Sequence, residues 1–151
     1  MPRSLSVAQA AFVFVSITLA GCSKEVLTDV SSQISYRQIV GTNFEVIGRL
    51  DAYGIRDHSS APVKYVTLIP PPGIAGSQIA FVREVPRGTK ATVTHVLQSN
   101  RLLDPQMTLL VRIESTDSQL SIPARIDLFR GNEGKGAAGL NPSLYRKLEK
   151  E

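Results

Sequence analysis

The stretch VPRGTKATVTHVLQ, residues 85–98, decides the fold class that this sequence predicts. Pro86 and Gly88 stand between two runs of β-branched residues, where a tight turn with a glycine at positive φ would join two strands. In the second run, alternate positions are apolar or His95, which is the two-residue period of a strand with one buried face. The stretch therefore predicts a β-hairpin, with His95 packed among aliphatic side chains.

Similar runs continue on both sides of this stretch, separated by Gly, Pro, Asp, Asn and Ser. This pattern predicts an all-β domain, a small antiparallel barrel or sandwich of about six strands. The predicted strands are 43–50, 64–69, 78–85, 89–98, 107–114 and 123–129. Three prolines after Ile69 end one of them, because proline lacks a backbone donor. They favour a rigid polyproline II loop, and display to a partner's groove is the alternative.

The last 21 positions, residues 131–151, predict a glycine-rich linker followed by a short C-terminal helix. Asn141 as the N-cap and Pro142 at the first helical position form a typical helix start. A helix this short must bury its apolar face to be stable, either on its own domain or on a partner. We expect a partner, so the apolar residues of this face are the partner-binding candidates: Leu144, Tyr145 and Leu148.

An apolar run precedes the single cysteine of the chain. Residues 1–21 combine one basic side chain, Arg3, with an uncharged run and then small residues, which is the layout of a secretory signal. The run is about half the ~20 residues that a membrane-spanning helix needs. We therefore expect a removable signal at 1–21, a lipidated N-terminus and tether at 22–38, and the β-domain at 39–130.

The residues around this cysteine, Leu19, Ala20, Gly21 and Cys22, resemble the lipobox of bacterial lipoproteins. In that family the cysteine thiol receives diacylglycerol, the signal is cut just before it, and the new amino terminus is usually acylated. The resemblance implies lipidation of Cys22 and attachment to a membrane through its acyl chains. Ser23 stands where an aspartate favours retention in the inner membrane of enterobacteria, which implies the periplasmic face of the outer membrane.

A second resemblance concerns the β-domain. The run VPRGTKATVTHV, residues 85–96, resembles the start of bacterial Src-homology-3-like wall-associated domains, in which a Pro-Gly turn precedes a strand. It implies a small barrel.

Composition bounds the partners that the mature chain can have. Removing residues 1–21 leaves 130 residues, which fits one domain, with 16 basic against 13 acidic residues and a net charge of +3. This excess is far from the dense basic surface of a nucleic-acid-binding protein, so no nucleic acid is expected. One cysteine allows no disulfide within the chain.

Few residues of the sequence are arranged for catalysis. Asp57, His58, Ser59 and Ser60 hold all the types of a catalytic triad side by side, but adjacent loop residues rarely converge on one atom, so we expect a solvated loop. The two histidines are not spaced as metal ligands, and no cofactor fingerprint is present. The leading interpretation is therefore a lipid-anchored binding or assembly module of the bacterial cell envelope, whose partner is an envelope protein or a cell-wall polymer. The alternatives are a cell-wall hydrolase that uses His58 or His95, and an inhibitor of a lytic enzyme.

Overall fold

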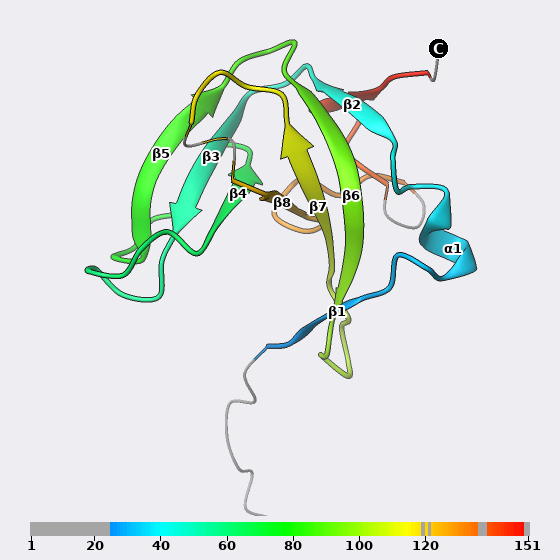
Figure 1. Cartoon of the computed structure of the whole chain (residues 1–151), viewed down its shortest axis with the longest axis horizontal. Helices are drawn as coiled ribbons and strands as arrows, with labels where there is room; N and C mark the ends of the chain where they lie inside the picture. Colours follow the sequence, from blue (N-terminus) through cyan, green and yellow to red (C-terminus); the bar gives the residue numbers. More distant parts are fainter. Residues whose placement is uncertain (1–24, 119, 121, 136–138, 150–151) are drawn as a thin grey trace, which may run out of the picture.

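The computed structural model describes residues 25–118, 120, 122–135 and 139–149 (Figure 1). In this part of the chain nine strands form one sheet, in the order β5-β3-β4-β8-β7-β6-β2-β9, and β1 also pairs with β6. The elements are β1 (Leu27–Asp29), α1 (Ile34–Arg37), β2 (Asn43–Val46), β3 (Leu50–Ile55), β4 (Tyr65–Ile69), β5 (Ile79–Val85), β6 (Lys90–Ser99), β7 (Met107–Ile113), β8 (Ala124–Asp127) and β9 (Tyr145–Lys147). No described helix has the length and apolar character that crossing a bilayer requires.

The sheet curls strongly, as Figure 1 shows. The edge strand β5 connects to β6, sixth in the order, through residues 86–89 alone. In a flat sheet these strands would lie about 24 Å apart, since neighbours are spaced by about 4.8 Å. A connection this short spans less than about 18 Å even when fully extended, and here it turns tightly, with Thr89 N donating to Pro86 O at 3.2 Å. The curl brings the two strands together, and the core lies inside it.

The core consists of the inward-facing side chains of the curled sheet. Its fully buried aliphatic residues come from strands on both sides of the curl: Val46, Leu50, Val66, Leu68, Val85, Val93, Val96, Leu109, Val111 and Ile126. In β7 and β8 they alternate with more exposed side chains, as the sequence predicted.

The predicted barrel or sandwich of about six strands is wrong. The chain is all-β, but its strands form one large mixed sheet, in which β4 and β8 pair in parallel. Within the described residues, β5 pairs with β3 and β9 with β2, so these edge strands do not close a barrel. The turn at Gly88 forms with φ of 87°, but it joins strands that pair with other neighbours, so the predicted hairpin is absent from this sheet. A local turn motif cannot reveal which strands pair.

The predicted C-terminal helix is also wrong. The start signal is used, because Ser143 N donates to Asn141 Oδ1 at 2.9 Å and Tyr145 N donates to Asn141 O at 3.0 Å. After this single turn the chain extends as β9 and pairs with β2. The edge of β2 offers hydrogen-bond partners that an isolated short helix would lack.

His95 does not pack in the core, contrary to the prediction. A β-bulge between Val93 and His95 places one extra residue, Thr94, opposite β7. The extra residue reverses the alternation, so Val96 is buried and His95 is exposed.

The prediction for the three prolines after Ile69 holds only in part. The strand β4 does end at Ile69, but the prolines form a turn, in which Gly73 N donates to Pro70 O.

Candidate functional site

A groove runs beside β1, and we call it the β1 groove. It comprises two adjoining hollows of about 470 and 100 Å³. Side chains from the start of the described chain and from β1, β3, β4 and β8 line both: Glu25, Leu27, Ile55, Tyr65 and Arg125. Positions far apart in the sequence thus meet here because the curled sheet brings their strands together.

The polar side chains of the β1 groove are held by contacts across neighbouring strands. The Arg125 guanidinium lies 3.8 Å from the centre of the Tyr65 ring, a distance typical of a cation–π contact. The two carboxylate oxygens of Asp127 accept hydrogen bonds from Thr67 Oγ1 at 3.2 Å and Thr108 Oγ1 at 2.8 Å. These contacts fix the floor of the groove, and they use both carboxylate oxygens of Asp127 as hydrogen-bond acceptors. The arrangement suits recognition of a polar or acidic ligand.

The rim of the β1 groove adds further charge. Lys64 Nζ binds both carboxylate oxygens of Asp57, at 2.8 and 3.1 Å. Arg56 donates from Nη2 to Ser77 O at 3.3 Å, while its Nε is buried without a hydrogen-bond partner in the described part of the chain. Because Lys64 is paired with Asp57, Arg56 supplies the excess positive charge at the end of the groove that β3 and β4 share.

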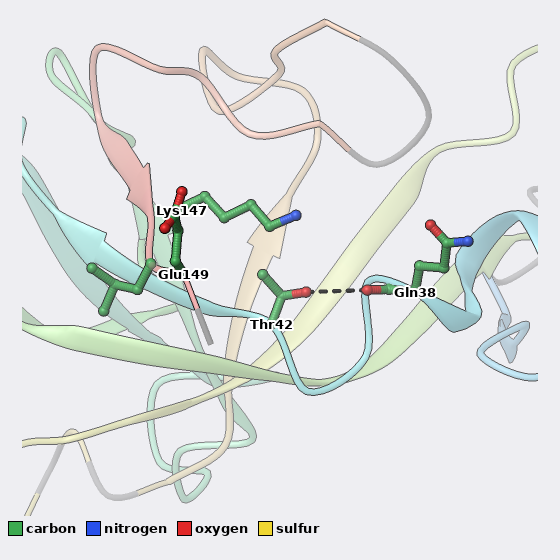
Figure 2. A pocket seen from close by; sticks show the side chains of 5 residues that line it. Gln38, Thr42, Lys147 and Glu149 are labelled. Atoms are coloured by element: carbon green, nitrogen blue, oxygen red, sulfur yellow. Dashed lines mark hydrogen bonds between the residues drawn. The ribbon is translucent and has the colours of Figure 1, made fainter. Parts of the chain in front are cut away.

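A separate hollow of about 450 Å³ lies between the segment after α1 and the strand β9, and we call it the tail pocket (Figure 2). Its lining residues are Gln38, Thr42, Lys147, Leu148 and Glu149. The Thr42 hydroxyl donates to the Gln38 carbonyl at 3.2 Å, and the Lys147 side chain extends from β9 toward these two residues. The pocket is polar on one side and can accept a partner side chain, but its lining provides neither a thiol nor a histidine.

The structure places the two histidines apart and outside these hollows. His58 lies on the exposed loop after β3, as predicted, with Nδ1 3.1 Å from Ser60 Oγ, while the neighbouring carboxylate of Asp57 binds Lys64. His95 Nε2 lies 4.0 Å from Asp29 Oδ2, with about half of each side chain exposed. Among the described residues, no group of three His, Cys, Asp or Glu side chains is arranged to hold a metal ion.

The carboxylate beside His95 has a lowered pKa. Hydrogen bonds from the Ser31 side chain and backbone lower the pKa of Asp29, and attraction to His95 adds a smaller effect. A lowered pKa means that this carboxylate stabilises the fold above the ordinary aspartate range and that the contribution is lost as the pH falls through the lowered value.

We expect the Asp29 carboxyl carbon, followed by NMR, to titrate below the ordinary value of 3.8. Ser31→Ala should raise that midpoint more than His95→Gln does, because the hydrogen bond from the Ser31 hydroxyl is the largest cause of the shift and the backbone hydrogen bond remains in the variant. Equal midpoints in the parent protein and in Ser31→Ala would contradict this assignment.

The partner-binding candidates of the tail have different positions. Tyr145 is buried in the chain's own core, Leu144 packs against that core, and Leu148 lines the tail pocket. The side chains of Leu144 and Tyr145 therefore pack on the chain's own domain and not on a partner. The lipobox residues and Cys22 lie outside the described residues.

Sequence reasoning missed Arg125, which lines the β1 groove, and Asn132, which links two strands by buried hydrogen bonds. Arg125 lies in the predicted strand 123–129, and Asn132 stands in the glycine-rich stretch that predicts a linker. Asn132 is fully buried and bonded to both β4 and Tyr145. No local pattern signals either role, because each depends on strands distant in the sequence.

Comparison of the chain with models of protein families, with curated proteins and with solved structures finds no match.

Proposed function

We propose that this protein is a lipid-anchored binding or assembly module of the bacterial cell envelope, held at the periplasmic face of the outer membrane. The observation that carries the proposal is the run Leu19-Ala20-Gly21-Cys22 directly after a short apolar segment. An acyl anchor on Cys22 localises the domain, and the domain then binds an envelope protein or a wall polymer.

The surface of the domain supports a binding role. The β1 groove is an open and mainly polar hollow, and the tail pocket is open with both polar and apolar lining. The larger hollow of the groove and the tail pocket both have volumes in the range of sites that hold small ligands or partner side chains. Three basic groups, Arg56, Lys64 and Arg125, line the larger hollow of the β1 groove against the two carboxylates of Glu25 and Asp57, and this small basic excess favours an acidic partner there. The phosphate- or carboxylate-bearing polymers of a cell wall and an acidic protein surface both have this chemistry.

The hydrolase alternative has less support from the described residues. A hydrolase aligns a nucleophile, a base and an acid around one reacting atom. His58 contacts the hydroxyl of Ser60, yet both are on an exposed loop, and Asp57 beside them binds Lys64. His95 has a carboxylate within 4.0 Å but lines neither the β1 groove nor the tail pocket.

Mass spectrometry of the protein purified from bacterial membranes tests the anchor. We expect the N-terminal peptide to begin at Cys22 and to be heavier by the mass of two or three acyl chains with the glycerol. Cleavage at another residue, or an unmodified Cys22 in the membrane-bound protein, would contradict the proposal. Ser23→Ala is a matched control, because it changes the adjacent residue and leaves the modified thiol in place.

A further inference from the structure

The connection between β6 and β7 presents two leucines entirely to solvent. Leu102 is 98% exposed and Leu103 is 100% exposed, the highest values among the large apolar side chains of the described chain. They are adjacent, at the far end of the loop formed by residues 100–106, which we call the hairpin tip. A pair of fully exposed leucines is costly in water and suggests contact with an apolar surface.

The described chain begins beside this hairpin tip. Because β1 runs antiparallel to β6, with Leu27 opposite Ser99, the chain before β1 and the chain after β6 leave the sheet at the same end. Asn100 N donates to Val26 O at 3.0 Å, and Val26 N donates to Asn100 Oδ1 at 3.0 Å. Figure 1 shows the blue start of β1 and the hairpin together at the foot of the molecule.

Covalent geometry keeps Cys22 close to the same place. Only Ser23 and Lys24 separate it from Glu25. Three trans peptide steps of 3.8 Å hold the Cα atoms of Cys22 and Glu25 within about 11 Å of each other. Glu25 in turn lies against the hairpin, with its Oε1 3.4 Å from Arg101 Nε. The expected 17-residue tether at 22–38 is therefore not available as a spacer, since β1 is already part of the sheet by Leu27.

We propose that Leu102 and Leu103 insert into the lipid surface next to the acyl chains of Cys22, as a second apolar contact that sets the orientation of the domain. This inference rests on the lipid anchor of the proposed function. An anchor whose Cα atom lies within about 11 Å of that of Glu25 holds this end of the sheet close to the bilayer, with the exposed leucines of the hairpin tip on the same side. The apolar face of an amphipathic helix at such a surface is buried about 5–10 Å into the boundary between headgroups and acyl chains, and two leucines at a loop tip can enter the same region.

The charges around the hairpin tip indicate what drives the insertion. Arg101 is paired with Glu25, and Asp104 follows the two leucines, so the tip carries no excess of positive charge. Attraction to anionic lipids therefore contributes little, and burial of apolar surface is the main term. The contact should persist in vesicles of zwitterionic phosphatidylcholine alone.

The sequence offers a clean spectroscopic test, because it contains no tryptophan. The probe is Leu103→Trp in the full chain, purified from membranes and reconstituted in phosphatidylcholine vesicles with and without brominated acyl chains. The matched control is Arg87→Trp, in the turn at the opposite end of β6, a strand of 10 residues that spans about 30 Å. We expect blue-shifted, bromine-quenched emission at position 103 and unshifted, unquenched emission at position 87.

Two readouts separate this proposal from the anchor itself. The mass of the N-terminal peptide reports whether Cys22 carries lipid, and the quenching reports whether the hairpin tip enters the bilayer. Unquenched emission at position 103 overturns the insertion, whether or not the lipid is present, and leaves a protein partner as the use of the leucines. Quenching at position 103 supports it, and Leu102→Asp in the same background should then abolish the quenching, whereas Leu102→Ile should preserve it. Quenching equal at 103 and 87 would also overturn it.

Discussion

Tyr145→Ala is expected to destabilise the domain by about 3–5 kcal/mol, the usual cost of removing a large buried aromatic side chain. Tyr145 is only 3% exposed and is a member of the main core cluster. Its ring fills the core at the point where β9 pairs with β2. The substitution should therefore lower the thermal midpoint by roughly 10 °C or more for a domain of this size.

The hydroxyl of Tyr145 adds a second, separable contribution. It donates to Asn132 Oδ1 at 2.8 Å, and Asn132 Nδ2 donates to Leu68 O at 2.8 Å. Asn132 is fully buried, so each of these groups would pay a desolvation cost without its partner. Tyr145→Phe keeps the ring and leaves one acceptor unsatisfied, for which we expect a loss of about 1–3 kcal/mol.

The pH dependence distinguishes the two contributions. Burial raises the pKa of Tyr145 well above the ordinary 10.0. The unfolded chain can ionise this phenol near pH 10 while the folded chain cannot, so stability that is present below pH 10 is lost as the pH rises further. Tyr145→Phe should show a weaker alkaline loss than the parent protein.

Thermal denaturation followed by circular dichroism, at neutral pH and above pH 10, measures all of these effects. Lys147→Ala, on the same strand with an exposed side chain, is the control and should change the midpoint little. If Tyr145→Ala melts within a few degrees of the parent protein, β9 is not part of the stable fold, and the tail would then be free for a partner.

The tail illustrates which strands can be predicted from the sequence and which cannot. The strands β4, β5, β7 and β8 were predicted closely, because each has several residues of alternating or β-branched character. The strands β1 and β9 have three residues each, which is too short for any period to be visible. Their pairing with β6 and β2 depends on exposed strand edges elsewhere in the chain, and no local pattern encodes this.

The first predicted strand, 43–50, failed for a related reason. Its apolar residues are real core residues, but the chain breaks at Gly48 into β2 and β3, which lie far apart in the sheet order. A Cβ added at Gly48 would lie 2.6 Å from Leu144 Cδ2 and from Ser143 O, so the tail crosses closely over this point. Gly48 N and Ile47 N both donate to Leu144 O. Gly48 thus leaves room for residues that come almost 100 positions later in the chain. The alternation of apolar residues within 43–50 cannot reveal this contact.

The candidate site was predicted still less completely. The exposure of His95 follows from one inserted residue in the pairing of β6 with β7, and a bulge of this kind has no reliable sequence signature. The β1 groove requires the curl that brings Arg125 and Tyr65 beside Leu27. The lipobox resemblance, in contrast, is a short linear motif that is independent of the fold, so the sequence alone can predict it.

Cys22→Ala is expected to have the largest effect on the location of the protein. Each buried methylene contributes about 0.8 kcal/mol to membrane binding, a single acyl chain gives only marginal attachment, and two or three chains give a stable one. The thiol of Cys22 is the only one in the chain, so no other cysteine can replace it as the lipid acceptor. Most of the Cys22→Ala protein should therefore appear either in the soluble periplasmic fraction or as an uncleaved precursor with a higher mass.

The leucines of the hairpin tip determine how much of the Cys22→Ala protein should remain on the membrane. Two leucines bury far less apolar surface than two acyl chains, so they orient an anchored domain but do not hold an unanchored one. Fractionation followed by immunoblotting and intact mass should find little processed Cys22→Ala protein in washed membranes, and Leu102→Ser with Leu103→Ser should remove what remains. The leucine changes alone should leave the lipidated protein in the membrane fraction, because the acyl chains suffice. Processed Cys22→Ala protein that lacks both leucines could instead stay membrane-bound at the level of the parent protein. Neither the acyl anchor nor the hairpin tip would then hold it at the membrane. The attachment would come from a protein partner that binds the β1 groove or the tail pocket.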